Sequence, residues 1–262
     1  MAKKEGKPMQ TAYAINTLSE FLAVRDVPVL TQDALLRRFG FPRADVMVLF
    51  GGSVLAGGDV LASAIRENAA KTYVIVGGAG HTTPDLRKKM QPFLPHLDTA
   101  DLPEAVLFDR YIRTVHQVQA QYLETKSTNC GNNITYLLRL LAENRIPCSS
   151  IILTQDGTMQ RRMGATLAKE APHIQQIHFA AYQAHVDEKG RYTADIRGMW
   201  PTDRFVTMLL GEISRLRDDE NGYGPRGKNF IAHVDIPADV EAAFAHLQSL
   251  YAVRDADPLF AT

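Results

Sequence analysis

The chain has 262 residues, of which 45% are hydrophobic and 22% are charged, a composition typical of folded globular proteins rather than of fibrous, disordered or membrane proteins. Lysine plus arginine and aspartate plus glutamate each number 29, so the zero net charge argues against general binding of nucleic acid or anionic lipid. No apolar run approaches the roughly 20 residues that span a bilayer, and no hydrophobic segment follows the first lysines. We therefore expect a cytoplasmic protein that does not bind membranes.

Two helices are expected first, over residues 12–24 and 31–39, and the second should begin after the cap residue Thr31 and end at Gly40. Short apolar runs then alternate with longer helical stretches, which favours parallel strands joined by crossover helices. The expected strands are 45–50, 72–76, 119–124, 150–154 and 176–180, and the expected helices between them are 59–70, 103–117, 132–144 and 158–170. This order predicts an α/β three-layer sandwich with a mainly parallel five-stranded sheet.

The alternation stops after Gly198, where a helix over 201–216, a loop over 218–229, a half-exposed strand over 230–236 and a helix starting at Pro237 are expected. We expect a ligand-binding domain over 41–197 and a small, mainly helical cap made of residues 1–40 and 198–262. Four prolines between residues 82 and 103 favour a surface insert that could act as a lid.

Glycine-rich loops follow the first two strands, where ligands of parallel sheets bind. Their candidate residues are Gly51, Gly52, Ser53, Gly77, Gly78, Gly80 and His81. Glycine lets backbone amides approach a ligand closely, and amides at a helix start favour an anion. The alternative is that each loop is only a tight turn.

Two common functions do not fit these loops. Thr83 stands where the dinucleotide fingerprint would need a third glycine, and the second strand does not end in an acidic residue, so NAD is disfavoured. The surroundings of Ser53 lack the GxSxG pattern of serine hydrolases.

The third strand ends at the candidate Glu124 and is followed by a dense polar segment with the candidates Ser127, Asn129 and Asn133. Glu124 could accept hydrogen bonds from a ribose or an amine, or it could be satisfied by the amides that follow it. Cys130 at the next helix start could be a nucleophile, although a small buried thiol is the commoner case.

The fourth strand is followed by the candidates Gln155, Asp156, Met159 and Arg161. If Thr158 caps the next helix, Arg161 and Arg162 lie in its first turn, where positive charge opposes the helix dipole. A bound anion or a pairing with Asp156 would offset this, whereas the alternative is a solvated surface pair.

Neither the two cysteines, Cys130 and Cys148, nor the eight histidines have metal-ligand spacing, so no metal is expected and the thiols should be free. Only His81 stands out among the histidines, because of its loop.

The segments LFGGSVL, VGGAGHTT, STNCGNN and TQDGTMQRR, and above all GMWPTDRF, RLRDDENGYGPRG and FIAHVDIP, resemble those of the bacterial SanA/ElyC/YdcF family. The resemblance extends from about residue 12 to about residue 250 and implies a Rossmann-like sheet with a small additional helical region. It also implies S-adenosylmethionine as a candidate ligand, since this is the ligand usually suggested for the YdcF branch, but it implies no reaction. The family's motifs fall on Gly51, Gly52, Gly77, Gly78, Glu124, Ser127, Asn129, Asn133, Gln155, Met159 and Arg161.

Three functional hypotheses follow from these residues. The leading one is a cytoplasmic protein that binds an adenosine-type small molecule at the strand ends, with Glu124 or Asp156 on its ribose or amine and Arg161 on any acidic group. The second is a hydrolase or transferase acting on a phosphorylated, nucleotide-sugar or glycan precursor, with His81 and Glu124 as acid and base and Arg161 binding the anionic group. The third is a non-catalytic interaction module whose C-terminal loop and helix dock a partner or a second copy of the chain. The oligomeric state is open in all three.

Overall fold

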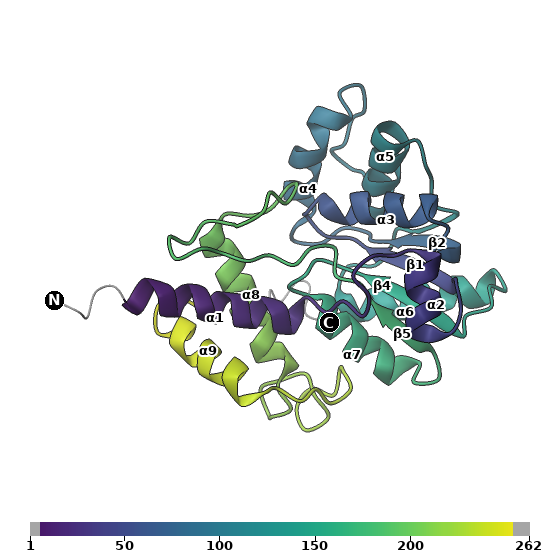
Figure 1. The fold of residues 1–262 in the computed structure, drawn as a ribbon. Coiled ribbons are helices and arrows are strands. Elements are labelled where there is room, and N and C mark those ends of the chain that lie inside the picture. Colours follow the sequence, from purple (N-terminus) through teal and green to yellow (C-terminus); the bar gives the residue numbers. More distant parts are fainter. Residues whose placement is uncertain (1–5, 254–262) are drawn as a thin grey trace.

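The computed structural model describes residues 6–253, and within them the chain forms one parallel sheet with the strand order β3-β2-β1-β4-β5. The strands are β1 (Ala44–Phe50), β2 (Ala70–Val76), β3 (Tyr122–Glu124), β4 (Ser150–Thr154) and β5 (Gln175–His178). Helices cover both faces of the sheet (Figure 1). The predicted Rossmann-like α/β sandwich with a parallel five-stranded sheet is therefore confirmed.

The two faces of the sheet have separate cores because successive side chains of a strand point in opposite directions. Met47 and Leu49 belong to a cluster shared with α2 (Gln32–Phe39), α3 (Ala56–Arg66), α4 (Thr83–Met90) and α5 (Glu104–His116). Val48 and Phe50 belong to the opposite cluster, shared with α6 (Cys130–Glu143) and α7 (Gln160–Glu170). Burial on both faces explains why the central strands read as continuous apolar runs rather than alternating ones.

A third core lies beside the sheet and joins α1 (Gly6–Leu22), α8 (Thr202–Leu216) and α9 (Ala238–Gln248). Figure 1 shows these three helices side by side at the left of the molecule. The predicted boundary between the ligand-binding domain and this cap stays a prediction, and residues 1–5 and 254–262 of the cap lie outside the described residues. Within the first 40 residues, α2 packs into the sheet core through the fully buried Leu35.

The segment over 82–103 is more ordered than the expected surface insert. It contains α4 and a short 3₁₀ helix, Gln91–Phe93, and the side chains of Leu86 and Met90 are fully buried. The prolines permit this because Pro84 lies in the first turn of α4 and Pro92 in the short helix, where their missing amide hydrogens are tolerated.

The prediction of a half-exposed strand over 230–236 is wrong. The amides of Phe230 and Ile231 both donate to the carbonyl of Tyr223, and the amide of Ala232 donates to that of Ala165, so no strand ladder forms here. The alternating pattern reflects contacts with the cap and α7 instead. The last helix nevertheless begins where it was expected, directly after Pro237.

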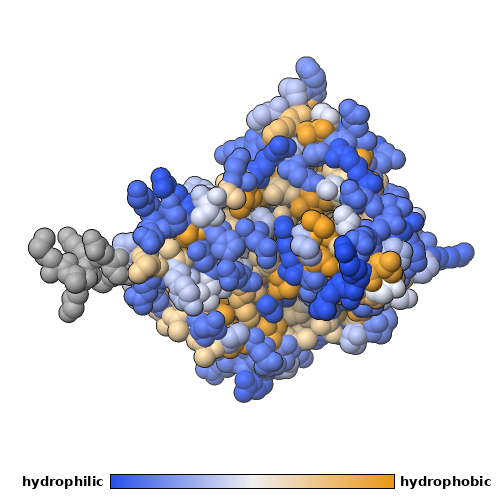
Figure 2. Space-filling model, in the orientation of Figure 1, coloured by the Kyte–Doolittle hydropathy of each residue, from blue (hydrophilic) through white to orange (hydrophobic). Residues whose placement is uncertain are grey.

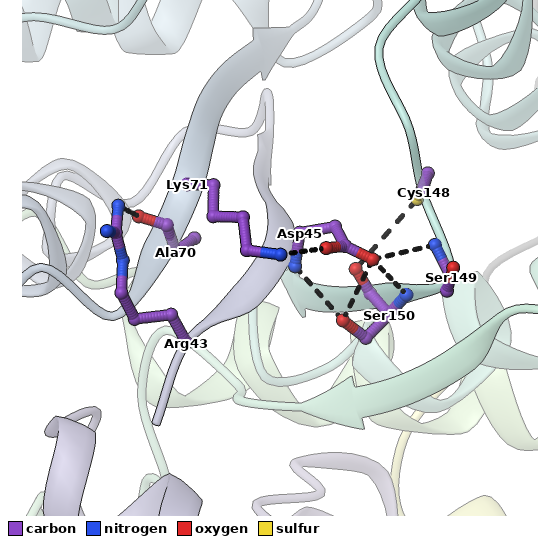
Figure 3. Close-up of polar contacts among 7 residues, drawn as sticks. All are labelled: Arg43, Asp45, Ala70, Lys71, Cys148, Ser149 and Ser150. Carbon is purple, nitrogen blue, oxygen red and sulfur yellow. Dashed lines mark hydrogen bonds and ion pairs between the residues drawn. The ribbon is translucent and has the colours of Figure 1, made fainter. Parts of the chain in front are cut away.

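The amino-terminal end of the sheet is held by Asp45 (Figure 3). Its carboxylate accepts hydrogen bonds from Lys71 Nζ at 2.7 Å and from the amides of Ser149 and Ser150 at 2.8 and 3.1 Å. Burial raises the pKa of Asp45, but Lys71 and these amides outweigh it and bring the pKa below its usual range. This network ties β1 to β2 and β4 at the end opposite the glycine loops.

The outer surface is mixed in character. Figure 2 shows a mostly hydrophilic face on which hydrophobic residues lie in small groups, as is normal for folded proteins. Over residues 6–253, none of the helices combines the length and the apolar composition that crossing a bilayer requires.

Candidate functional site

A cavity of about 390 Å³ lies at the carboxyl ends of the parallel strands, where the sheet meets the cap. Its sheet side is formed by the loops that follow β1, β2, β3 and β4, and its cap side by α8 and the loop after it. A cavity of this size and position is typical of small-molecule sites in open parallel sheets.

Most residues singled out by the sequence come together in this cavity. It is lined by Gly51, Gly52, Gly77, Gly78, Gly80, His81, Ser127, Asn129, Asn133, Asp156 and Met159. Segments that are up to about 100 positions apart in the chain therefore form one surface. The parallel register explains this, because it brings the carboxyl ends of all strands to the same edge.

Ser53 and Gln155 do not line the cavity but hold its walls. Ser53 Oγ accepts a hydrogen bond from Trp200 Nε1 at 2.8 Å and so connects the β1 loop to the cap. Gln155 Nε2 donates to the carbonyl of Gly51 at 3.0 Å, which joins the loops after β1 and β4. Both residues are fully buried.

Glu124 also lies outside the cavity lining. Its Oε1 accepts a hydrogen bond from the amide of Lys126 at 2.6 Å, and its Oε2 accepts one from the amide of Ser127 at 3.2 Å. The sequence left two roles open for this carboxylate, binding a ligand or accepting hydrogen bonds from the amides that follow it. The structure shows the second arrangement. Glu124 shapes the β3 loop that carries Ser127 and Asn129 to the cavity.

The two adjacent arginines of α7 have different surroundings, since Arg161 contacts α1 and Arg162 lines the cavity. Arg161 lies 4.0 Å over the ring of Phe21 and donates to its carbonyl, away from the cavity. Arg162 lines the cavity and forms a bidentate ion pair with Glu212 of α8, at 2.6 and 2.9 Å. The anion that offsets its charge near the start of α7 is therefore Glu212 and not Asp156, and α7 begins at Gln160 after Met159 rather than after Thr158.

Glu104 is the main cavity residue that the sequence reading missed. It begins α5, whose first two amides donate to the carbonyls of Gly78 and Gly77, and this docks the helix start on the β2 loop. Its Oε1 accepts a hydrogen bond from Thr83 Oγ1 at 2.7 Å. An acidic residue in a first helical turn is ordinary, so nothing local in the sequence distinguished Glu104.

Glu104 and Asp156 are both buried and both titrate far from their usual range. Burial raises the pKa of Glu104 to about 7 against the opposing hydrogen bonds of Thr83 and Thr82. Burial also raises the pKa of Asp156 to about 7, assisted by the negative charge of Glu104 and opposed by Lys89 and the amide of Ser53. Carboxyl groups shifted in this way inside a cavity are candidates for ligand binding or proton transfer.

These two carboxylates explain the glycines of the first loop. A Cβ atom added to Gly52 would lie 2.5 Å from Asp156 Oδ2, and one added to Gly51 would overlap Glu104 Oε2. Because the space beside both glycines is filled by carboxylate, the loop packs directly against the two acids. The two glycines thus leave room for the side chains of Glu104 and Asp156, and they also let the backbone approach a ligand closely.

A nucleophilic role for Cys130 receives little support from the site. Burial raises the pKa of Cys130, although the Arg162 charge opposes this, and a protonated thiol is a poor nucleophile. Within residues 6–253 there is also no cluster of three or more His, Cys, Asp or Glu side chains arranged to bind a metal ion.

The chain was compared with models of known protein families, and no family model matches it.

Proposed function

We propose that this protein binds an adenosine-type small molecule in the strand-end cavity, with S-adenosylmethionine as the leading candidate. The observation that carries the proposal is the cavity itself, which combines two buried carboxylates with glycine loops at the carboxyl ends of β1 and β2. Its volume of about 390 Å³ falls in the range typical of sites for ligands of this size.

The cavity residues suggest how such a ligand would be held. Glu104 and Asp156 would accept hydrogen bonds from ribose hydroxyls or an amine, the role that the sequence suggested for Glu124 or Asp156. Tyr223 and Phe230, which meet edge to face at 5.3 Å between ring centroids, offer an aromatic surface for a base. The segments that resemble the SanA/ElyC/YdcF family contribute most of this lining, which agrees with the ligand suggested for that family's YdcF branch.

Calorimetric titration of the purified protein tests this proposal. We expect saturable binding of S-adenosylmethionine and weaker or no binding of ATP, NAD and a nucleotide sugar. Glu104→Gln should weaken the binding about tenfold or more, the typical effect of losing a charge-assisted hydrogen bond. Arg161→Gln is the matched control, since Arg161 lies outside the cavity, and should leave the affinity unchanged. Binding of a control ligand instead of S-adenosylmethionine would contradict the proposal.

A second candidate function is hydrolysis or group transfer on a phosphorylated, nucleotide-sugar or glycan precursor. It is favoured by the near-neutral pKa of Glu104 and Asp156, about 7 for each, because such groups can both give and take protons at neutral pH. In this case Asp156 and His81 would be the first residues to substitute, since both line the cavity.

Screening phosphoester and nucleotide-sugar substrates tests this alternative. Turnover should fall at least a hundredfold in Asp156→Asn, as expected when a general acid or base is lost, and His81→Ala should be screened beside it. Turnover that survives both substitutions, or its absence on every substrate, would count against this function. The third hypothesis, docking of a partner by residues 217–262, stays a prediction.

A further inference from the structure

The two sides of the cavity differ in charge. On the sheet side, Glu104 and Asp156 are exposed by only 7% and 4%, and their carboxyl groups lie against Gly51 and Gly52. Within the described residues, the rest of the sheet-side lining is uncharged apart from His81. We call this surface the acidic wall. Outside the lining, the positive charges of Lys89 and Arg87 act on Asp156 and Glu104 respectively.

A second part of the lining comes from α7 and α8 and carries charged residues of both signs. It is lined by Arg162, Lys169, Glu170, Glu212 and Arg215. Glu212 accepts the bidentate pair from Arg162 and lies 3.5 Å from Arg215 Nη1, so two guanidinium groups share one carboxylate. Lys169 and Glu170 balance each other, which leaves this surface, the basic wall, with one excess positive charge.

The charges of the two walls are costly to bury without partners. A cationic group near the acidic wall would favour ionisation of its carboxyl groups, whereas an anionic group there would oppose it. An anionic group at the basic wall would gain charge-assisted hydrogen bonds from guanidinium groups whose orientation is fixed by Glu212. A neutral ligand would supply no counter-charge to either wall, so the excess charge of each wall would gain nothing from its binding.

We infer that the cavity selects a zwitterionic ligand with a sulfonium centre, which faces Glu104 and Asp156, and an anionic group, which faces Arg162 and Arg215. The inference rests on the proposed function and adds the chemical class that the site distinguishes. The apolar middle of the ligand would then lie between the walls, beside Met159, Tyr223 and Phe230, which also line the cavity.

Four adenosine compounds separate the sulfonium from the carboxylate. S-adenosylmethionine carries a sulfonium, an α-ammonium and a carboxylate, and S-adenosylhomocysteine lacks only the sulfonium charge. Decarboxylated S-adenosylmethionine lacks only the carboxylate, and methylthioadenosine lacks all three charges. Titrated calorimetrically at pH 8, the wild-type protein should bind the first compound roughly tenfold more tightly than the second and the third, the effect of one charge-assisted contact.

Variants of each wall assign the two preferences. Asp156→Asn should abolish the preference for the sulfonium compound and keep the preference for the carboxylate. Arg215→Gln should do the reverse, and it leaves the Arg162–Glu212 pair in place. Arg161→Gln, on the same helix as Arg162 but directed at Phe21, should keep both preferences. Glu104→Gln replaces Asp156→Asn if circular dichroism shows that the latter is unfolded.

Three outcomes are decisive. The crossed pattern of lost preferences supports the inference. Binding of S-adenosylmethionine without preference over the other compounds, or an equal loss for all four in Asp156→Asn, overturns the inference and leaves the proposed function standing. Absence of binding by all four compounds contradicts the proposed function and the inference together.

Discussion

The last residue of β3 and the loop after β4 each provide a buried carboxylate, and the structure uses the two in different ways. Glu124, which ends β3, accepts hydrogen bonds from the amides of Lys126 and Ser127 and thereby shapes the loop that follows it. Asp156, after β4, faces the cavity beside Gly52 and near the charge of Glu104. A carboxylate that local amides surround stabilises the fold, whereas one that is buried near a like charge in a cavity carries a cost that a cationic ligand would reduce.

The same contrast separates the two arginines of α7. Arg161 packs on Phe21 at the junction with α1, and Arg162 forms the ion pair with Glu212 in the cavity wall. Neighbouring residues of the same type thus have different roles because successive helix positions point about 100° apart. The following predictions test these two contrasts, beginning with the largest expected effect.

Removing the cation of the buried ion pair should be the most damaging change. Arg162→Leu leaves Glu212, which is 2% exposed, without its bidentate partner, so the free energy of unfolding should fall by about 3–5 kcal/mol. Urea unfolding measures the loss. Arg161→Leu, the matched control, should cost clearly less, and the double variant Arg162→Leu/Glu212→Leu should recover much of the stability. Equal losses for the two arginine variants would contradict the contrast between them.

Asp156→Asn should stabilise the protein in a pH-dependent way. Because the pKa of Asp156 is about 7 in the folded state and near 4 when unfolded, ionisation destabilises the fold. This penalty is absent below about pH 4, grows as the pH rises and is complete above about pH 7. At pH 8 the variant should therefore gain up to about 4 kcal/mol over wild type, and at pH 4 almost nothing.

Urea unfolding of both proteins at pH 4, 6 and 8 measures this gain. A gain that does not depend on pH would show that ionised Asp156 does not destabilise the fold. The contrast drawn between Asp156 and Glu124 would then be wrong.

Glu124→Ala should destabilise the protein, in contrast to Asp156→Asn. The amides of Lys126 and Ser127 lose their acceptor, so the free energy of unfolding should fall by about 1–3 kcal/mol. Hydrogen exchange followed by NMR should show faster exchange of these two amides while those of β4 are unchanged. If both amides stay protected, the structural role assigned to Glu124 is wrong.

The smallest effect is expected at the end of β1, where Ser53 and Trp200 connect the sheet to the cap. Trp200→Phe keeps an aromatic ring and removes the hydrogen bond to Ser53 Oγ, which should cost about 1 kcal/mol. Ser53→Ala should cost a similar amount, and the double variant should cost less than the two losses added together. Additive losses would show that this hydrogen bond does not couple the two regions.

The sheet and most of its helices were predictable because their signals are local. Apolar runs fixed the central strands to within about two residues, and Thr31 and Gly40 cap α2 as expected, with Thr31 Oγ1 accepting from the amide of Ala34 and Gly40 in the left-handed region. The false strand over 230–236 shows the limit of such patterns. An alternating segment becomes a strand only where a partner edge is available, and the amides of Phe230 and Ile231 find the Tyr223 carbonyl instead.

The loops of the candidate site were predictable, but the roles of single side chains were not. Parallel strands necessarily bring the loops after β1 to β4 together, so the glycines and Asp156 could be found without a structure. Glu104 could not, since it reaches the cavity from α5 through the docking of that helix on the β2 loop. Likewise, only the rotation of α7 against α8 decides that Arg162, and not Arg161, lines the cavity.

The most direct test compares Asp156 with Glu124 by calorimetric titration of the wild-type protein and one variant of each residue with S-adenosylmethionine. We expect saturable binding to the wild-type protein, about tenfold weaker binding to Asp156→Asn, and unchanged affinity in Glu124→Gln, which keeps the size of its side chain. Loss of affinity in Glu124→Gln with none in Asp156→Asn would place the ligand at β3 rather than at the cavity wall formed by β4, and would contradict the central claim.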